Sequence, residues 1–233
     1  MKLLAIDTST EACSVALSVD GEVRERYEIA PRRHTELVLP WADALLAEAG
    51  VAKTQLDAIA VARGPGAFTG VRLAVAIVQG MALALDLPVI PVSTLAALAL
   101  RAPDANDDAR ILSAIDARMG EVYLGAFVRD DTALLRAIGD EWMAVPAQAN
   151  LPVGNAWIGM GTGFAAAEGA LKQALGETLV QCDAAALPHA ADVARLAALA
   201  WSRGEAIAPD ALEPAYLRNK VALTLVEQQK ARG

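Results

Sequence analysis

The chain is poor in the residues that usually mark a metal site or a nucleophilic active site. Its 233 residues include two cysteines, Cys13 and Cys182, and two histidines, His34 and His189. The cysteines show neither CxxC nor Cys/His spacing, so neither a disulfide framework nor a zinc site is predicted. A His-x-x-x-His pair on one helix turn would suit a metal, but Val38 follows His34 at that distance. We expect no metal site and no catalytic residue, and we expect His34 to be solvated at a helix start.

Positive charge and long apolar runs are also scarce. Lys and Arg number 20 against 28 Asp and Glu, a net charge of −8, and affinity for nucleic acid comes mostly from basic side chains. Any contact with nucleic acid should therefore need a basic partner. The weakly charged stretch 71–100 is interrupted at Asp86 after about fifteen helical positions, whereas a membrane span needs ~20. The apolar start 1–6 ends at Asp7, too early for a signal peptide. These absences predict a soluble, cytoplasmic protein with no membrane contact.

Hydrophobic residues, in contrast, make up 55% of the chain, enough for one large core or two small ones. An internal repeat favours two. A predicted strand ends in Ala-Ile-Asp at Asp7 and is followed by a short turn and a second strand at 12–19. Asp116, 109 positions later (116 − 7), ends a second Ala-Ile-Asp in the same context, before a predicted strand at 121–128. The chain therefore looks like two copies of one structural unit.

Further predicted elements follow in each half. In the first half these are a strand at 22–29, a helix at 35–49, a strand at 57–62, a helix at 69–85, a strand at 89–92 and a helix at 94–101. In the second they are strands at 132–138 and 156–160 and helices at 164–175 and 190–203. The pattern predicts an α/β fold in which a mixed sheet with flanking helices is present twice. We expect domains at 1–103 and 104–233, joined in the polar stretch 103–108, the second carrying a C-terminal tail.

Residues 64–72 (Gly-Pro-Gly-Ala-Phe-Thr-Gly-Val-Arg) lie between a predicted strand and a predicted helix, as a phosphate-binding loop would. They fit neither common form of that loop. The P-loop form requires a Lys after its last glycine, and the dinucleotide form requires a glycine where Thr69 stands. This segment alone therefore does not indicate a function.

A duplicated unit with an Asp at the end of its first strand resembles the actin, hexokinase and Hsp70 superfamily, a ribonuclease-H-like fold. In that superfamily each Asp faces a nucleotide and a metal ion held between the halves, within an Asp-x-Gly-Ser/Thr turn whose Gly lets the backbone approach a phosphate. Here Ser9 and Arg118 stand at the two Gly positions. Residues 159–163 (Gly-Met-Gly-Thr-Gly) lie where the superfamily has glycines that contact adenosine. The resemblance implies a degenerate nucleotide cleft at Asp7, Ser9 and Asp116, or none.

Four segments together resemble the TsaB (YeaZ) family from the first strand to the C-terminus: 4–17, 64–72, 116–123 and 213–218. This resemblance implies a non-catalytic subunit that binds and activates a TsaD-type transferase. That transferase forms threonylcarbamoyladenosine next to the anticodon of tRNAs that read codons beginning with A. The implied partners are the TsaD-type homologue, in a heterodimer, and a TsaE-type ATPase, with tRNA reached only through the complex. ATP and a metal ion are then handled by partner subunits, and the isolated chain could form a homodimer.

Two other functions stay open on the residues alone. A small-molecule kinase of the actin-like fold is opposed by the missing glycines at Ser9 and Arg118. A metal-dependent, glycoprotease-like peptidase has no histidine pair to carry its metal, although a catalytic triad is a spatial arrangement that sequence order does not exclude.

A subunit without chemistry should carry a surface for its partner, and the helix at 71–85 is our candidate. It is apolar on nearly all sides, although a helix on a sheet needs only one apolar stripe. Ala76, Gly80 and Ala84 follow each other at a spacing of four, so another helix could approach closely along that line. The alternative is that elements of the same domain cover both faces. The family resemblance implies pairing through the helices of the first half, so the prediction also includes Leu37, Trp41 and Leu45 of the helix at 35–49.

Arg72 belongs to the same prediction. A cation in the first turn of a helix opposes the helix dipole, at a cost of about 0.3–1 kcal/mol. We therefore expect an acid or anion nearby: a carboxylate of the same chain, a group of the partner, or an anion held by the amides of residues 64–70.

Overall fold

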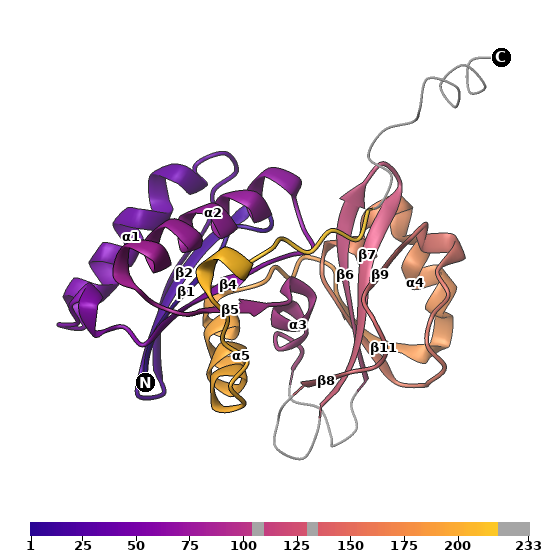
Figure 1. Cartoon of the computed structure of the whole chain (residues 1–233). Helices are drawn as coiled ribbons and strands as arrows, with labels where there is room; N and C mark the ends of the chain where they lie inside the picture. Colours follow the sequence, from indigo (N-terminus) through magenta and orange to yellow (C-terminus); the bar gives the residue numbers. More distant parts are fainter. Residues whose placement is uncertain (104–109, 130–134, 219–233) are drawn as a thin grey trace.

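The protein consists of two sheets with their helices, arranged as two lobes (Figure 1). The structure is a computed structural model and describes residues 1–103, 110–129 and 135–218. The strand order in the N-terminal lobe is β3-β2-β1-β4-β5, and the C-terminal lobe repeats it as β8-β7-β6-β10-β11, with β9 paired to β7. In both lobes the first two strands are antiparallel and the last two pair in parallel. The predicted duplicated α/β fold is confirmed.

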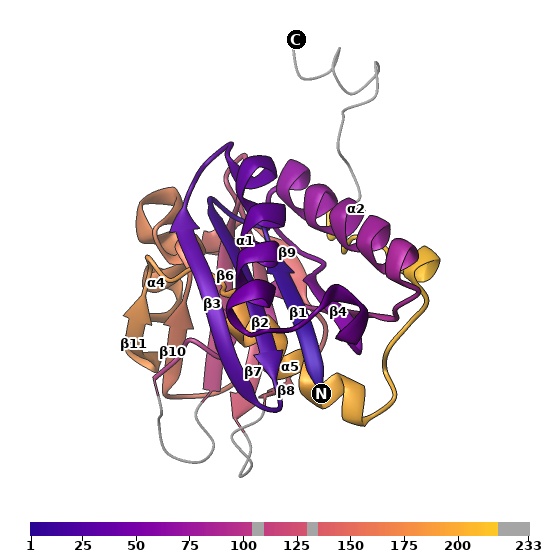
Figure 2. The same ribbon diagram turned by 90° about the vertical axis from the view of Figure 1, so that its left-hand side faces the viewer.

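The N-terminal sheet follows the predicted pattern closely. Its strands are β1 (Lys2–Asp7), β2 (Ala12–Val19), β3 (Glu22–Ile29), β4 (Ala58–Ala62) and β5 (Val89–Val92). The helices are α1 (His34–Glu48), α2 (Phe68–Leu85) and α3 (Thr94–Ala99). The strands β1, β2 and β4 are buried almost throughout, since helices cover both faces of the sheet. Figures 1 and 2 show α1 and α2 on one face and α5 (Ala190–Ser202) on the other.

The C-terminal lobe departs further from prediction. Its strands are β6 (Arg110–Arg118), β7 (Glu121–Arg129), β8 (Leu135–Ala137), β9 (Trp142–Ala144), β10 (Trp157–Met160) and β11 (Leu179–Asp183), and its α-helix is α4 (Ala170–Leu175). Short 3-10 turns are η1 (Lys53–Gln55), η2 (Pro146–Gln148), η3 (Thr162–Phe164), η4 (Ala166–Gly169), η5 (Gly176–Thr178) and η6 (Pro209–Ala211). The helix predicted at 164–175 is wrong in its first half, because Ala167, Glu168 and Gly169 adopt left-handed backbone angles. Strands β9 and β11 were not predicted. The start of the strand predicted at 132–138 and most of the stretch 103–108 lie outside the described residues.

Helix α2 is longer than predicted, because it begins at Phe68 and runs for 18 residues. By length and composition alone it could cross a membrane, a property that core helices of soluble proteins share. One side of α2 packs into the core of the N-terminal lobe through Ala74, Val75, Val78 and Ala82. The helix is therefore part of the fold, and only its other side is left open.

The two lobes exchange helices. Helix α3, from the first half of the sequence, packs on the C-terminal sheet through Leu95 and Leu98. Helix α5, from the second half, packs on the N-terminal sheet through Val193 and Ala197. The predicted division at 103/104 therefore separates the two sheets but not the two lobes, since α5 belongs to the lobe formed by the first half.

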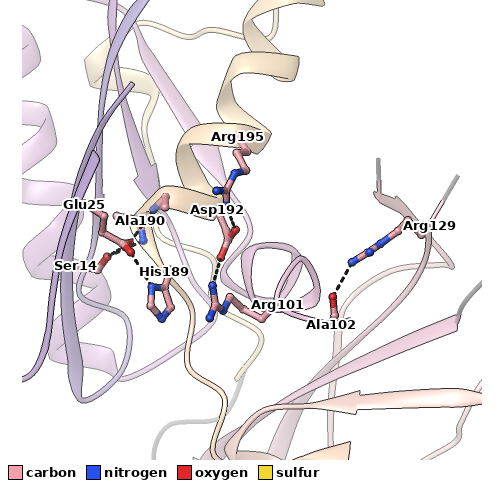
Figure 3. Close-up of polar contacts among 10 residues, drawn as sticks. Ser14, Glu25, Arg101, Ala102, Arg129, His189, Ala190, Asp192 and Arg195 are labelled. Carbon is pink, nitrogen blue, oxygen red and sulfur yellow. Dashed lines mark hydrogen bonds and ion pairs between the residues drawn. The ribbon is translucent and has the colours of Figure 1, made fainter. Parts of the chain in front are cut away.

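The N-terminus of α5 is fixed to the N-terminal sheet by side chains of β2 and β3 (Figure 3). Ser14 Oγ accepts a hydrogen bond from the Ala190 amide at 2.7 Å, and Glu25 accepts one from the Ala191 amide at 2.9 Å. The Glu25 carboxylate also lies 2.8 Å from His189 Nδ1. Burial acts to raise the pKa of Glu25, but the hydrogen bonds from His189, Ala191 and Ser14 outweigh it and lower the pKa. A negative charge at this helix terminus is also favoured by the helix dipole.

Candidate functional site between the lobes

The turn after Asp7 is buried, and one of the two carboxyl oxygens, Oδ2, has no hydrogen-bond partner among the described residues. Asp7 is 1% exposed, and its Oδ1 accepts hydrogen bonds from the Ser9 amide at 2.7 Å and from Ser9 Oγ at 2.6 Å. Burial raises the pKa of Asp7, and the two hydrogen bonds from Ser9 oppose that shift. Ser9, at the position where the superfamily has Gly, thus engages the carboxyl group of Asp7.

The glycine segment (residues 64–70) packs directly on this turn. The Ala67 amide donates to the Ser9 carbonyl at 2.7 Å, and Thr8 Oγ1 donates to the Gly70 carbonyl at 2.7 Å. A Cβ atom added to Gly66 or to Gly70 would lie less than 3.0 Å from the backbone of Ser9 or of Thr8. The glycines are therefore required for close packing between two backbone segments. This packing explains the glycines of the segment without a bound phosphate.

His34 holds the same turn from the other side. Its Nε2 lies 3.1 Å from the Thr10 carbonyl and 3.2 Å from the Ala12 carbonyl, and the side chain is half-buried. Carbonyl oxygens only accept hydrogen bonds, so Nε2 must be the donor. The prediction of a solvated histidine is wrong: His34 begins α1 as expected, but its imidazole ties that helix to the first turn.

The turn after Asp116 has opposite surroundings. Asp116 Oδ1 accepts from the Arg118 amide at 2.8 Å, and its Oδ2 lies 2.9 Å from Arg118 Nη1. Arg118 has φ of 64°, in the left-handed region that favours glycine. Met119 at the tip is 83% exposed. This second turn is therefore on the surface.

The glycines at 159–163 also serve packing. A Cβ on Gly161 or on Gly163 would lie less than 3.0 Å from Ala114 of β6, and one on Gly159 would meet the ring of Phe164. The next side chain, Thr162, accepts a hydrogen bond from the Asp116 amide at 3.2 Å. This segment thus fixes the second turn from behind.

A pocket of about 640 Å³ lies between the lobes, beside the second turn. Of the predicted site residues, Asp116 and Arg72 line it, whereas Asp7 and Ser9 do not. The remaining walls come from the glycine segment, the start of α2, the β6–β7 turn and residues 215–218. Only one of the three residues assigned to a degenerate nucleotide cleft, Asp116, therefore lines this pocket, and the nucleotide cleft stays a prediction.

Residues 213–218 cross from one lobe to the other and close one side of the pocket (Figure 1). The Ala215 amide donates to the Arg63 carbonyl at 2.8 Å in the N-terminal lobe. At the other end, Arg218 donates to the Ala117 carbonyl at 3.0 Å and pairs with Glu121 at 2.9 Å. We call this segment the strap. The sequence marked it only as a family signature, and nothing in its pattern indicated that it joins the lobes.

Arg72 is held by aromatic rings. Its guanidinium lies 3.7 Å from the centroid of the Phe68 ring, and its Nε donates to Tyr216 Oη of the strap at 2.6 Å. Within the described residues no carboxylate pairs with Arg72, so the prediction of a carboxylate of the same chain is wrong there. A cation over a ring face and one strap hydrogen bond take its place.

The predicted interface divides into exposed and buried residues. Arg72, Ala76, Gly80 and Ala84 are all exposed on α2, and a Cβ on Gly80 would meet no atom within 4 Å. Leu37 and Trp41 of α1 are half-buried and pack against the core. Leu45 is 2% exposed and lies inside that core, so its assignment to an open surface is wrong. Both helices cover one face of the sheet, and Leu45 points inward.

The described residues were also searched for clusters of metal-ligating side chains and for reactive thiols. No group of three or more His, Cys, Asp or Glu side chains that could hold a metal ion occurs in the described ranges. Cys13 is buried and Cys182 half-buried, and both are free. Burial raises the pKa of Cys13 to about 12, with the negative charges of Asp7 and Glu28 adding to the shift.

Two lobes with one strand order, each with an Asp at or near the end of its first strand, define a protein of the actin-like, ribonuclease-H-like class. A family model described as TsaD, tRNA N6-adenosine threonylcarbamoyltransferase, matches residues 26–226. The tRNA threonylcarbamoyladenosine biosynthesis protein TsaB of Escherichia coli K12 is 41% identical over 230 residues, 95% of this chain and 96% of that protein. The corresponding TsaB of Haemophilus influenzae is 42% identical over 230 residues, 95% of each chain.

The solved structures agree with these relatives. YeaZ from Pseudomonas aeruginosa is 45% identical, with a TM-score of 0.84 over 93% of this chain and 99% of that one. A second structure, of an uncharacterized Pseudomonas aeruginosa protein with similarity to peptidase YEAZ, is 46% identical with a TM-score of 0.85 over the same shares. The chain belongs to the TsaB (YeaZ) family, which confirms the resemblance drawn from the four sequence segments.

Proposed function

We propose that this chain is a non-catalytic subunit in the formation of threonylcarbamoyladenosine on tRNA, and that it binds and activates a TsaD-type transferase. Curated relatives over 95% of the chain are named as biosynthesis proteins of this modified base, and the matching family model describes the transferase itself. The observation that carries the proposal is the outward side of α2, an exposed line of small residues in a helix whose other side is core.

The state of the two aspartates supports a role without catalysis. Asp7 accepts two hydrogen bonds from Ser9, and Asp116 is engaged by the amide and the guanidinium of Arg118. Each carboxylate is thus bound by the residue at the superfamily's glycine position. In this proposal the chain carries no cofactor of its own, and ATP and the metal ion are handled by the partner subunits.

The line Ala76, Gly80, Ala84 supports a helix of the partner as the binding element. Small side chains at a spacing of four let two helix backbones approach closely and gain dense van der Waals contact. Trp41 and Leu37 of α1, which covers the same face of the sheet, are half-buried, and in this proposal their exposed parts belong to the same interface. The same area could pair two copies of the chain when the partner is absent.

The remaining parts of the proposal concern the assembly. A TsaE-type ATPase joins the pair, and tRNA is contacted only through the complex, in keeping with a net charge of −8. The place of action is the cytoplasm, without a membrane partner.

The experiment that tests this function is calorimetric titration of the chain with the TsaD-type transferase of the same organism, using Gly80→Leu and Gly80→Ala. Leu at this position should hold the two helices apart and lower the affinity by at least a hundredfold, whereas Ala should leave most of it. Gly80 is open in the isolated chain, so both variants should melt at or above the wild-type temperature. Wild-type affinity in a well-folded Gly80→Leu protein would contradict the assigned face.

A further inference from the structure

The exposed line on α2 continues into the pocket between the lobes. Phe68 and Arg72 precede Ala76, Gly80 and Ala84 at the same spacing of four, and all five residues are exposed. Phe68 and Arg72 also line the pocket. A helix packed along the line therefore ends, at the N-terminus of α2, beside the pocket mouth.

The pocket is largely apolar and its rim is made of exposed large side chains. Val71, Ile115 and Leu217 contribute to its walls. At the rim, Met119 is 83% exposed, Phe68 54% and Tyr216 50%. A few residues usually dominate the affinity of a protein interface. They are often aromatic or Arg side chains that surround a pocket from which the partner excludes water. The geometry thus suits an apolar side chain that enters from outside.

One cation at the pocket, Arg72, is open to an acidic group from outside, although the exposed carboxylate of Glu11, which has no ion-pair partner among the described residues, balances its charge. Its lining acids are Glu11 and Asp116 and its cations are Arg72, Arg118 and Arg218. Asp116 pairs with Arg118, and Arg218 pairs with Glu121 outside the pocket. Arg72 donates its Nε to Tyr216, and none of the described carboxylates pairs with its guanidinium. A carboxylate supplied by another molecule could form a bidentate pair with such a group.

We propose that the TsaD-type partner inserts an acidic segment with an apolar tip into this pocket, anchored by Arg72 and Phe68. The inference rests on the proposed function, since the same partner is taken to pack along α2. The strap has a positioning role here: Tyr216 holds Arg72 over the Phe68 ring before the partner arrives. An anchor ordered in advance loses less conformational entropy on binding.

The test uses the same titration, repeated at two salt concentrations, with variants of the pocket. Phe68→Ala should weaken binding about thirtyfold at both salt concentrations. Arg72→Gln should weaken it about tenfold at low salt and less at high salt, because screening already reduces the lost charge interaction. Arg203→Gln is the matched control: it removes one exposed guanidinium at the end of α5, on the opposite face of the sheet from α2, and should change affinity less than twofold.

Two substitutions of Met119 test the sign of the charge on the inserted segment. Both change the same exposed position at the pocket rim and differ only in the charge that they introduce. Met119→Glu should weaken binding, and Met119→Lys should retain or strengthen it. An equal loss of affinity in both variants would overturn the proposal that the inserted segment is acidic. Wild-type affinity in Phe68→Ala and Arg72→Gln, together with loss in Gly80→Leu, would overturn the pocket while leaving the proposed function intact. Absence of any binding by the wild-type chain would overturn both.

Discussion

The turn after Asp7 and the turn after Asp116 hold equivalent places in two lobes of one design, yet one is core and the other is surface. Thr8 and Ser9 are 0% exposed, beneath the glycine segment and His34, whereas Met119 is 83% exposed at the mouth of the pocket. In both turns the residue at the superfamily's glycine position binds the aspartate. Equivalent turns in the two lobes therefore differ in use: the first stabilises the core, and the second is available for contact with another molecule.

The largest effect is expected where the first turn meets the glycine segment. Gly70→Ala would place a Cβ less than 3.0 Å from the Thr8 carbonyl, against backbone that cannot move aside easily. Overpacking of this kind should cost at least ~3 kcal/mol of unfolding free energy. Gly80→Ala is the control on the same helix and should stabilise by up to ~1 kcal/mol. Urea denaturation measures both, and similar stabilities for the two variants would contradict the packing role of Gly70.

A smaller effect separates the two aspartates. Asp7→Ala leaves the Ser9 amide and hydroxyl buried without their acceptor, at a cost of about 1–3 kcal/mol. Asp116→Ala removes contacts with Arg118, whose side chain is 80% exposed, and should stay within ~0.5 kcal/mol of wild type. Thermal melts of the two variants check this order. If Asp116→Ala were the more damaging, the assignment of core and surface would be reversed.

The pH dependence of stability sharpens the same comparison. Burial raises the pKa of Asp7 in the folded protein, so the stability it contributes is complete below the pKa of the unfolded chain and declines as pH rises. Asp7→Asn should therefore gain stability relative to wild type between pH 4 and pH 7. Glu25, whose pKa is lowered, contributes stability that is lost as pH falls, so Glu25→Gln should lose most at pH 7. Urea melts at both pH values test the two signs.

Much of the N-terminal lobe could be predicted from its sequence because its signals are local. The strands predicted at 12–19, 22–29 and 89–92 have the bounds of β2, β3 and β5 in the structure. The helix predicted at 164–175 was wrong in its first half, because left-handed backbone angles at Ala167 and Glu168 interrupt a stretch whose composition suits a helix. The exchange of α3 and α5 between the lobes depends on contacts between distant segments, which periodicity does not encode.

The site was predicted less completely than the fold. The spacing of Ala76, Gly80 and Ala84 indicated an open face, and all three residues are exposed. Leu45 was assigned wrongly because the apolar stripe of α1 to which it belongs packs into the core of the same lobe. The contact of Arg72 with Tyr216 could not be found from sequence, because Tyr216 lies 144 positions away and joins it only through the strap.

The most direct test of the account is reconstituted transfer of threonylcarbamoyl to tRNA by the TsaD-type transferase and the TsaE-type ATPase, with this chain added as wild type or as Gly80→Leu. We predict efficient modification with the wild-type chain, and little modification either without the chain or with Gly80→Leu. Full modification in the absence of the chain, or full support by a Gly80→Leu protein that folds normally, would contradict it.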